Sequence, residues 1–486
     1  MNQAADNTEH GFLGVSPQER KITLVSFAYI FFVICSYYVI KPIRGSLGME
    51  LGKDNIPLLS LLSMIVLIGS NAIYSVIVGM YKRDIFIPFI TRFFALCLLV
   101  FWLTFSFAFS NQNFQVQTEA SENPSVLQPE EGIMTSQSVA SQPSVIVADL
   151  IETNPLRAIA ITVFYVWVGV FALMAVSMFW SFMNDVFSVG QSRRLYAIIG
   201  YGGLLGGAVG SFLTGKLVPI LGTANLFLVA LILLYPSIWC MRYIHHNFSA
   251  NENLNGGTII SESKSEKAHP PRPWDGFVSV WYAPILLFMA GEMFIFTFSS
   301  TLFYQQLYEM VNQVYAGKTD ETTAFFAGFF GYITVLSLFS QFFVTRLFMM
   351  FKNPVNGLFV FPVMQFAATV MMLVSPRLEI VSWGLIIGSA INYSTGRAIR
   401  ELVYIPLDRE QKYQGKGFID TVVFRFGDGI SAIILLGGLE FFSYGVWIDW
   451  TILFSMVIQF YVIIKIARLH AHKIGAGSEK ESLNDT

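Results

Sequence analysis

The sequence predicts an all-α membrane protein with twelve transmembrane helices in two halves of six. Of the 486 residues, 54% are hydrophobic and only 13% are charged, whereas about a quarter of the residues of a soluble chain are charged. Twelve apolar runs are long enough to cross about 30 Å of hydrocarbon as helices. A polar stretch separates the first six runs from the last six. This composition excludes a water-soluble enzyme, a nucleic-acid binder and a disordered scaffold.

The predicted spans lie at roughly 22–40, 56–80, 85–109, 158–183, 197–218, 225–244, 283–307, 323–350, 356–375, 380–403, 417–438 and 444–466. The predicted domains are an N-terminal tail (1–21), an N-terminal half (22–244), a linker (245–282), a C-terminal half (283–466) and a C-terminal tail (467–486). The linker is long, rich in Asn, Ser, Lys and Glu, and ends in prolines, as expected of a flexible connection.

Lysine and arginine set the predicted orientation. With the N-terminus inside, 19 of the 30 Lys and Arg residues fall on the inner side and seven on the outer side, as the positive-inside rule requires. A loop at about 110–157 is acidic and carries no basic residue over 111–156, so we expect it outside. The prediction is a multi-pass protein of the inner (cytoplasmic) membrane, with both termini and the linker in the cytoplasm.

The two halves echo each other. A basic loop at 191–196 leads into a glycine-bearing helix, and so does the loop at 410–416. Six spans, an inner linker and six more spans with repeated loops are typical of the major facilitator architecture, in which the substrate site lies between the halves near mid-membrane. The fold class is therefore major facilitator-like.

Glycine is concentrated in the fifth predicted span, where Gly202, Gly203, Gly206, Gly207 and Gly210 form overlapping GxxxG spacings. Small residues one turn apart let two helix backbones approach closely, and the same smooth face would allow a helix to slide or rock. A phosphate-binding loop is excluded because no strand precedes the glycines and no Lys-Ser/Thr pair follows them.

Charges inside apolar spans are costly and are candidates for function. Lys41 and Arg44 follow two tyrosines at the end of the first span, and Arg92 lies about 10 Å into the third span at 1.5 Å per residue. These three cations are candidate substrate-binding residues. The alternatives are that Lys41 and Arg44 snorkel to the interface and that Arg92 pairs with an acid or a carbonyl.

The tenth span carries a polar stripe at helical spacing, with Tyr393, Arg397, Arg400 and Glu401 as its candidate substrate-binding residues. Arg397 and Glu401 stand at i and i+4 and are expected to pair, which would leave Arg400 as the freer cation. An arginine beside aromatic rings suits a planar anionic ligand. The alternative is that the stripe only borders the inner loop.

Three further charges are candidates for coupling or for structural ion pairs. Arg425 and Asp428 lie one turn apart in the eleventh span, as a buried pair or as part of a ligand site. Glu292 in the seventh span is the best isolated carboxyl for carrying a proton, and a hydrogen bond to a neighbouring helix would explain it equally well.

The motifs resemble the ATP/ADP translocase family of nucleotide exchange transporters from intracellular bacteria and plastids, and their bacterial relatives. Residues 400–408 read RELVYIPLD and residues 412–420 read KYQGKGFID, which is similar to the corresponding run of that family. A segment that includes Asn184, at 179–196, and the end of the first span are also similar to family segments.

The resemblance implies a twelve-span carrier that exchanges nucleotides, with cations at Lys41 and Arg400 important for the substrate. Two departures are visible. The family carries glutamates in spans four and seven, where this chain reads YVWV at 165–168 and FSST at 298–301. Arg400 also stands where a lysine is usual.

The predicted function is secondary transport of an anionic solute by alternating access, with ATP/ADP-type nucleotide exchange as the first candidate. The alternative is a proton-coupled exporter of a small amphipathic molecule, with Glu292 and Asp428 as titrating groups. The predicted partners are the anionic solute and the lipid bilayer, with no nucleic acid, and the expected state is a monomer. All six histidines lie outside the predicted spans, so we expect no catalytic residues, no metal site and no cofactor.

Overall fold

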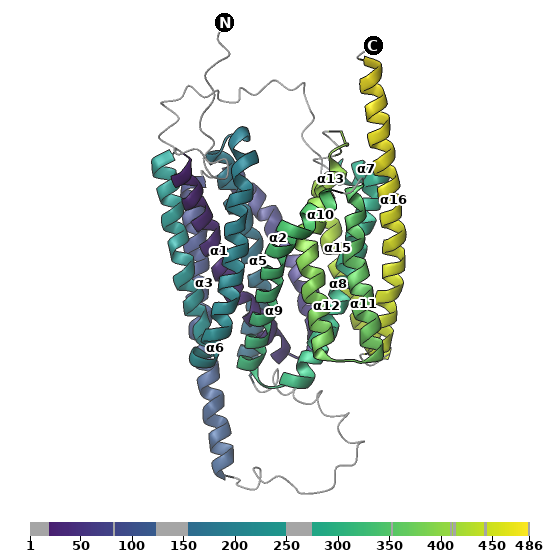
Figure 1. Cartoon of the computed structure of the whole chain (residues 1–486). Coiled ribbons are helices and arrows are strands. Elements are labelled where there is room, and N and C mark those ends of the chain that lie inside the picture. Colours follow the sequence, from purple (N-terminus) through teal and green to yellow (C-terminus); the bar gives the residue numbers. More distant parts are fainter. Residues whose placement is uncertain are drawn as a thin grey trace. The chain divides into compact units, whose positions relative to one another are not determined.

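Helices make up the described part of the chain, in which no strand occurs (Figure 1). The computed structural model describes residues 19–80, 83–122, 154–248, 275–350, 353–408, 411, 415–441 and 445–484. The all-α fold class is confirmed. The predicted linker and the acidic loop lie mostly outside the described residues.

The chain divides into two compact units. The first comprises residues 1–59, 65–251 and 315–331, and the second comprises 60–64, 252–314 and 332–486. The first turns of a helix from the predicted C-terminal half thus cluster with the first unit. The division into halves at 245–282 stays a prediction.

The helices from the N-terminal part of the chain are α1 (Arg20–Glu50), η2 (Lys53–Asn55), α2 (Ile56–Met80), α3 (Arg83–Glu122), α5 (Pro155–Val186) and α6 (Val189–Phe248). The following helices are α7 (Asp275–Tyr282), α8 (Pro284–Tyr315), α9 (Thr319–Phe339), η5 (Ser340–Val344), α10 (Thr345–Met349), η6 (Pro354–Phe359) and α11 (Val360–Val374). The last are α12 (Leu378–Ile391), η7 (Asn392–Gly396), α13 (Arg397–Tyr404), α14 (Lys416–Phe418), η9 (Ile419–Val423), α15 (Phe424–Phe441) and α16 (Val446–Asn484).

The glycines of α6 bring this helix against α1, beside which it runs in the first unit (Figure 1). A Cβ atom on Gly202 would lie 2.5 Å from the carbonyl oxygen of Phe27. Cβ atoms on Gly206 and Gly210 would meet backbone atoms of α1 at least as closely. The predicted close approach of helix backbones is confirmed, because only a hydrogen side chain fits at these positions.

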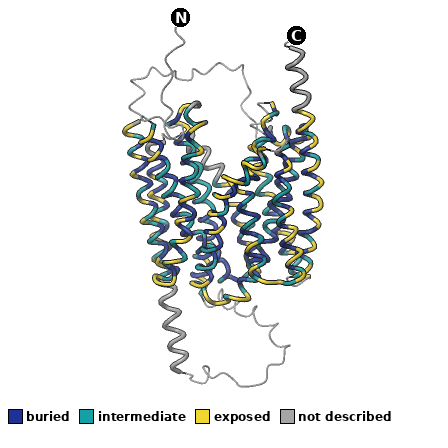
Figure 2. Tube along the Cα trace, in the orientation of Figure 1, coloured by how far each residue is buried: buried dark blue, intermediate teal, exposed yellow. Residues whose placement is uncertain are grey.

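Each unit has its own apolar core, and the buried residues lie on the inner faces of the helices (Figure 2). In the first unit, Phe105 and Phe227 stack with ring centroids 5.5 Å apart, and Phe164 meets Phe227 edge to face at 5.0 Å. In the second unit, α8, α13 and α16 share a cluster that includes Met289, Val403 and Ile463. The stacked and edge-to-face arrangements of the phenylalanine rings in the first unit are favourable geometries for aromatic pairs.

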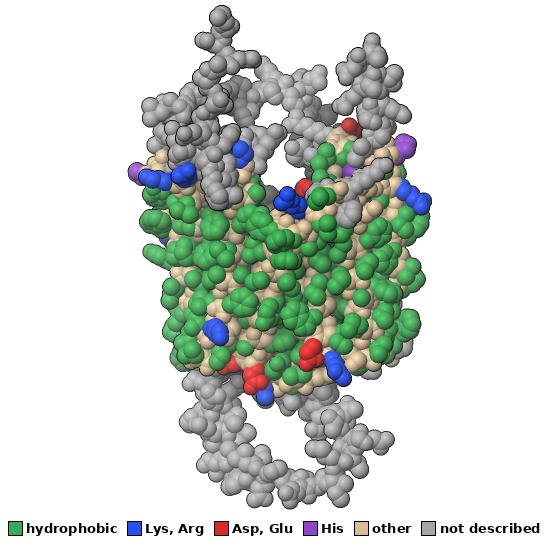
Figure 3. Space-filling view, in the orientation of Figure 1, with side chains coloured by type: hydrophobic (Ala, Val, Ile, Leu, Met, Phe, Trp, Pro, Cys, Tyr) green, Lys and Arg blue, Asp and Glu red, His purple; other side chains and the backbone are tan. Residues whose placement is uncertain are grey.

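The outer faces of the described helices are also apolar. Side chains such as Ile65, Trp239 and Phe454 are 58%, 62% and 69% exposed. In the view of Figure 3, hydrophobic side chains cover the middle of the helices, while charged side chains gather toward the helix ends. Soluble proteins rarely expose so much contiguous apolar surface, so these faces are suited to lipid, and the chain is a multi-pass membrane protein.

Ten stretches of the described residues are long and apolar enough to cross a membrane. One of them, Arg194–Asn247, contains a break at Gly222, where φ is 75° and ψ is 161°. The predicted tenth span is not among the ten; in the structure it corresponds to α12, η7 and α13, in which a π-helical segment interrupts the α-helix. The break at Gly222 and the π-helical segment account for the difference between the ten stretches and the twelve predicted spans. The number twelve stays a prediction.

The first span extends further than predicted. Its predicted end at residue 40 is wrong, because α1 continues through Pro42 to Glu50. Pro42 removes one helical hydrogen bond, yet packing on both sides keeps the helix intact, since Ile40, Ile43 and Leu47 are fully buried. Lys41 and Arg44 therefore lie inside a helix, with two more turns beyond them.

Gly206→Ala should destabilise the protein by about 1–3 kcal/mol, because the new Cβ would press on the backbone of α1, which cannot move aside as a side chain can. Gly200→Ala is the matched control in the same helix, since a Cβ added there would have no atom within 4 Å. The control should be neutral or stabilising by up to about 1 kcal/mol. Thermal unfolding of the purified proteins in detergent measures both, and equal midpoints would contradict the close packing.

Candidate functional site

The first unit holds two cations among aromatic rings. Lys41 Nζ lies 3.9 Å from the ring centroid of Phe330 on α9 and 4.9 Å from that of Tyr38. The Arg44 guanidinium carbon lies 3.9 Å above the ring of Tyr165 on α5. Cation–π contacts of this kind stabilise a desolvated positive charge by about 2 kcal/mol or more.

Neither of these cations has a carboxylate partner among the described residues of the structure. The Nε atom of Arg44 is buried and has no hydrogen-bond partner. Glycine makes room for the ring that covers Arg44, since a Cβ on Gly48 would lie 2.9 Å from Tyr165 Cε2. This part of the first unit therefore carries uncompensated positive charge, which is the condition under which an anion is attracted.

The second unit holds a third cation, Arg400, in the middle of α13. Its Nη2 donates to Asn392 Oδ1 at 2.9 Å, and its Nη1 lies 3.6 Å from Glu292 Oε1 on α8. The guanidinium also lies 5.5 Å from the ring centroid of Phe296. The expectation that Arg400 is the freer cation is wrong in this respect, because Glu292 faces it.

A π-helical segment, Asn392–Gly396, shapes this site. The wider turn brings the Asn392 amide to the Arg400 guanidinium, eight residues along the chain. A Cβ on Gly396 would lie 3.2 Å from Asn392 Oδ1 and 3.8 Å from Arg400 Nη1, so glycine leaves space beside both groups. Single π-helical turns inside α-helices are frequent at functional sites.

Glu401 does not pair with Arg397 as predicted. Its two carboxylate oxygens accept from Lys416 Nζ at 2.5 and 2.7 Å, while Arg397 is exposed. The i, i+4 pair fails because Lys416, at the start of α14, offers the carboxylate a bidentate contact from another element. This contact ties the two parts of the 400–420 motif together.

Glu292 is buried and is not isolated, which corrects the prediction. It is 2% exposed, and its carboxylate faces Arg400. Its second oxygen, Oε2, is buried without a hydrogen-bond partner, as are Gln459 Nε2, Gln459 Oε1 and the Tyr404 hydroxyl. Gln459 was not among the predicted residues, because a single glutamine in a long apolar run of α16 carries no pattern of its own.

The Arg425 and Asp428 pair forms as expected, with Nη1 and Oδ2 3.6 Å apart. It is not buried, because the side chains are 34% and 27% exposed. Asp428 Oδ1 accepts from the Thr301 hydroxyl at 2.9 Å. A carboxylate from α15 is thus hydrogen-bonded to α8 within 298–301, where the chain lacks the glutamate of the family it resembles.

The other three predicted residues, Arg92, Tyr393 and Asn184, are exposed in the described structure. Arg92 is exposed on α3, with no described partner, and Tyr393 is 51% exposed. Asn184 is exposed and accepts from the Tyr196 hydroxyl at 2.8 Å, a contact within the 179–196 segment. Their roles in binding stay predictions.

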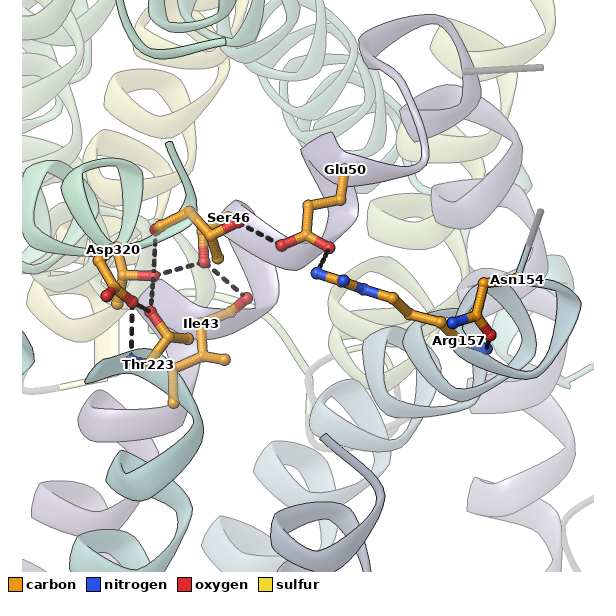
Figure 4. Close-up of polar contacts among 9 residues, drawn as sticks. Ile43, Ser46, Glu50, Asn154, Arg157, Thr223 and Asp320 are labelled. Carbon is orange, nitrogen blue, oxygen red and sulfur yellow. Dashed lines mark hydrogen bonds and ion pairs between the residues drawn. The ribbon is translucent and has the colours of Figure 1, made fainter. Parts of the chain in front are cut away.

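The first unit also contains a polar network that was not predicted (Figure 4). Glu50, the last residue of α1, accepts from Arg157 Nη2 at 2.5 Å and from the Thr319 hydroxyl. The Glu50 and Arg157 side chains are only 12% and 3% exposed. Arg157 is one of the seven cations predicted on the outer side, and nothing in its surroundings in the sequence distinguishes it.

The same network includes the residue that follows the break in α6. Directly after Gly222, the backbone N–H of Thr223 donates to Asp320 Oδ1 at 2.8 Å, and the Thr223 hydroxyl lies 2.6 Å from the same oxygen (Figure 4). The hydroxyls of Ser46 and Thr323 lie 2.6 Å apart. Asp320 therefore caps the helix that resumes after the break, and the first turn of α9 is bound to both α1 and α6.

Comparisons with known proteins agree with the motifs. Residues 341–472 match the model of the TLC ATP/ADP transporter family. Over 322 residues the chain is 25% identical to ADP,ATP carrier protein 1 of Chlamydia trachomatis serovar D and 24% identical to that of Chlamydia muridarum. Each match covers 58% of this chain and 59% of the relative, so the chain spans less than two thirds of the relatives' length.

Solved transporters share the fold. A bacterial homologue of the human lysosomal transporter Spinster gives a TM-score of 0.52 over 94% of this chain and 97% of that one, with 14% identity. A bacterial homologue of the iron transporter ferroportin gives 0.56 (93% and 99%), and the D-xylose-proton symporter gives 0.54 (91% and 97%), both at 11% identity. At these identities the likeness concerns the fold alone. The major facilitator-like fold and the resemblance to ATP/ADP carriers, which are transporters and not enzymes, are confirmed.

Arg157→Met should destabilise the protein by about 3–5 kcal/mol, because it leaves the carboxylate of Glu50 buried without its cation. The double variant with Glu50→Gln should recover most of that loss. Glu321→Gln is the control, since its pair with Lys318 is more than half exposed and such pairs contribute little. Chemical or thermal unfolding in detergent measures the set, and a double variant no more stable than Arg157→Met would argue against the pair.

Proposed function

We propose that this membrane transporter carries an anionic solute by alternating access and that its substrates are nucleotides, exchanged as ATP and ADP. The observation that carries the proposal is the charge of the first unit: Lys41 and Arg44 lie among aromatic rings inside α1 and have no carboxylate partner among the described residues. A bound anion would compensate them, since an unpaired charge inside a membrane protein is costly.

The second unit supports an anion with a planar group. Arg400 presents a guanidinium beside the Phe296 ring, and arginine both binds phosphate as a two-pronged donor and stacks on aromatic planes. The residues matched by the TLC ATP/ADP transporter family include Arg400 and the whole 400–420 motif. The relatives are named ADP,ATP carriers, which makes a nucleotide the first substrate to test.

The departures from the family are consistent with an anion site. The chain reads YVWV at 165–168, where the family carries a glutamate, and the ring of Tyr165 in this segment lies against Arg44. An aromatic ring stabilises the guanidinium without neutralising it. A nucleoside triphosphate carries roughly four negative charges, and each buried charge costs several kcal/mol unless cations offset it.

The proposed setting is the inner membrane, with both termini in the cytoplasm, because the basic residues favour the inner side. Single cysteines at Gln128 and Ser261, both outside the described residues, should be labelled by an impermeant maleimide from opposite sides. Gln128 should react in intact cells, and Ser261 only after permeabilisation. Labelling of both positions from one side would contradict the twelve-span topology.

Arg400→Ala should weaken nucleotide binding by about 2–5 kcal/mol, the usual cost of removing one partner of a desolvated charge contact in a binding site. Arg400→Lys should recover part of the loss, because lysine keeps the charge and loses the planar fork. The readout is the rise in unfolding temperature on adding ADP, ATP, adenosine or sugar phosphates to purified protein, since a ligand stabilises the state that it binds.

The control for this series is Arg377→Ala, which removes an exposed arginine at the start of α12. It should leave stabilisation by nucleotides unchanged. Stabilisation by adenosine as strong as by ADP would contradict an anion site. Unchanged stabilisation of Arg400→Ala by ADP would remove Arg400 from the binding site.

A further inference from the structure

The contact between Arg400 and Glu292 is an incomplete ion pair. The two nearest atoms, Nη1 and Oε1, are 3.6 Å apart, which is longer than a hydrogen bond. The closest partner of the guanidinium is instead the neutral amide of Asn392, at 2.9 Å from Nη2. Arg400 is thus held by Asn392, and the carboxylate approaches it without closing a hydrogen bond.

The polar atoms around Glu292 are left unsatisfied. Glu292 Oε2 on α8, both side-chain polar atoms of Gln459 on α16 and the hydroxyl of Tyr404 on α13 are buried and have no hydrogen-bond partner. Gln459 lies close enough to the Glu292 carboxyl to interact with it, although the contact does not have the geometry of a full hydrogen bond. Unsatisfied buried polar groups are costly, so the side chains of Glu292, Gln459 and Tyr404 favour a state in which they make further hydrogen bonds.

A proton on Glu292 would supply the missing donor. An ionised carboxylate can only accept hydrogen bonds, whereas a protonated one also donates. Gln459 Oε1 is a buried acceptor without a donor, and a protonated Glu292 could donate to it. The ionised carboxylate of Glu292 has no proton to donate to Gln459 Oε1.

An anion bound at Arg400 would also favour a proton on Glu292. A second negative group on the guanidinium would stand next to the Glu292 carboxylate in a buried site, and two adjacent negative charges favour protonation of one of them. Among the described residues, the other charged or titratable groups near this pair are Tyr404 on α13, Asp420 on η9, and the paired Glu401 and Lys416. Of the acids, only Glu292 is almost completely buried and directly faces Arg400.

We propose that Glu292 is the resident counter-ion of Arg400 and takes up one proton when an anionic group of the substrate replaces it. The proton comes from the solvent on the side where the substrate binds, stays on the Glu292 carboxyl while the anion contacts Arg400, and returns to solvent when the anion leaves. This inference rests on the proposed function. One anion exchanged for another would then carry a proton in each direction, so the exchange would not draw on a proton gradient.

The test is proton uptake on binding. Purified full-length protein in weakly buffered detergent solution is mixed with ADP at the same pH, and an indicator dye records the protons taken up. The dissociation constant is measured in parallel between pH 6 and pH 8.5. Because the protonated form binds the anion, affinity should rise as the pH falls, by about tenfold per pH unit while Glu292 is ionised in the empty protein.

Glu292→Gln should bind ADP at least as tightly as the wild type binds it at low pH, and its remaining pH dependence reports only the titration of ADP itself. Glu309→Gln, a carboxyl on the same helix that is also buried, should keep the wild-type dependence. Equal pH slopes for wild type and Glu292→Gln, or no proton uptake by the wild type beyond that of Glu292→Gln, would overturn the inference. If Glu292→Gln does not fold, proton uptake by the wild type at pH 8.5, where ADP itself is fully ionised, decides the matter.

Pyrophosphate is the second probe and separates this inference from the proposed substrate. Binding of ADP without extra proton uptake would contradict the role of Glu292 and leave nucleotide transport standing. Binding of pyrophosphate with proton uptake, in the absence of ADP binding, would support the role of Glu292 and contradict the nucleotide. Binding of neither anion would overturn both.

Discussion

The cost of holding a positive charge away from water governs the functional part of this protein. Lys41 and Arg44 lie inside α1, where the chain gives them aromatic rings instead of carboxylates. Rings reduce the cost of desolvation and leave the charge in place. Arg400 has a carboxylate nearby, but at a distance that leaves the pair incomplete. The two units thus hold cations whose compensation depends on something that binds, which is the property expected of an anion carrier.

The scaffold places these charges through close packing. The glycines of α6 let α1 approach to backbone contact, and α1 in turn carries both cations of the first unit. At its end, Glu50 joins Arg157, while Asp320 caps the helix that resumes after Gly222. The first turn of α9, which contributes the polar groups of this network, belongs to the same helix as Phe330, the ring that lies against Lys41. The cation site and the polar network are therefore parts of one packed assembly in the first unit.

Much of this was predictable from the sequence, and the failures have physical causes. Apolar runs and glycine spacing are local patterns, so the helices and the close packing at the glycines of α6 could be predicted, although not that α1 is the partner. The motif at 400–420 identified the relatives. Pairings between distant residues could not be predicted, since i, i+4 spacing favoured Arg397 for Glu401, while Lys416 takes that carboxylate from another element. Gln459 and Arg157 gave no signal, because a single polar residue acquires its meaning only from the helices that surround it.

The central claim is that partly buried cations bind and exchange anionic nucleotides, and exchange in proteoliposomes tests it most directly. Vesicles that contain the purified protein and are loaded with unlabelled ADP should take up labelled ATP. The uptake should respond to membrane potential, because the two nucleotides differ in charge, and a proton uncoupler should leave it intact. Uptake that needs no internal nucleotide and collapses with the uncoupler would contradict the account and favour a proton-coupled exporter.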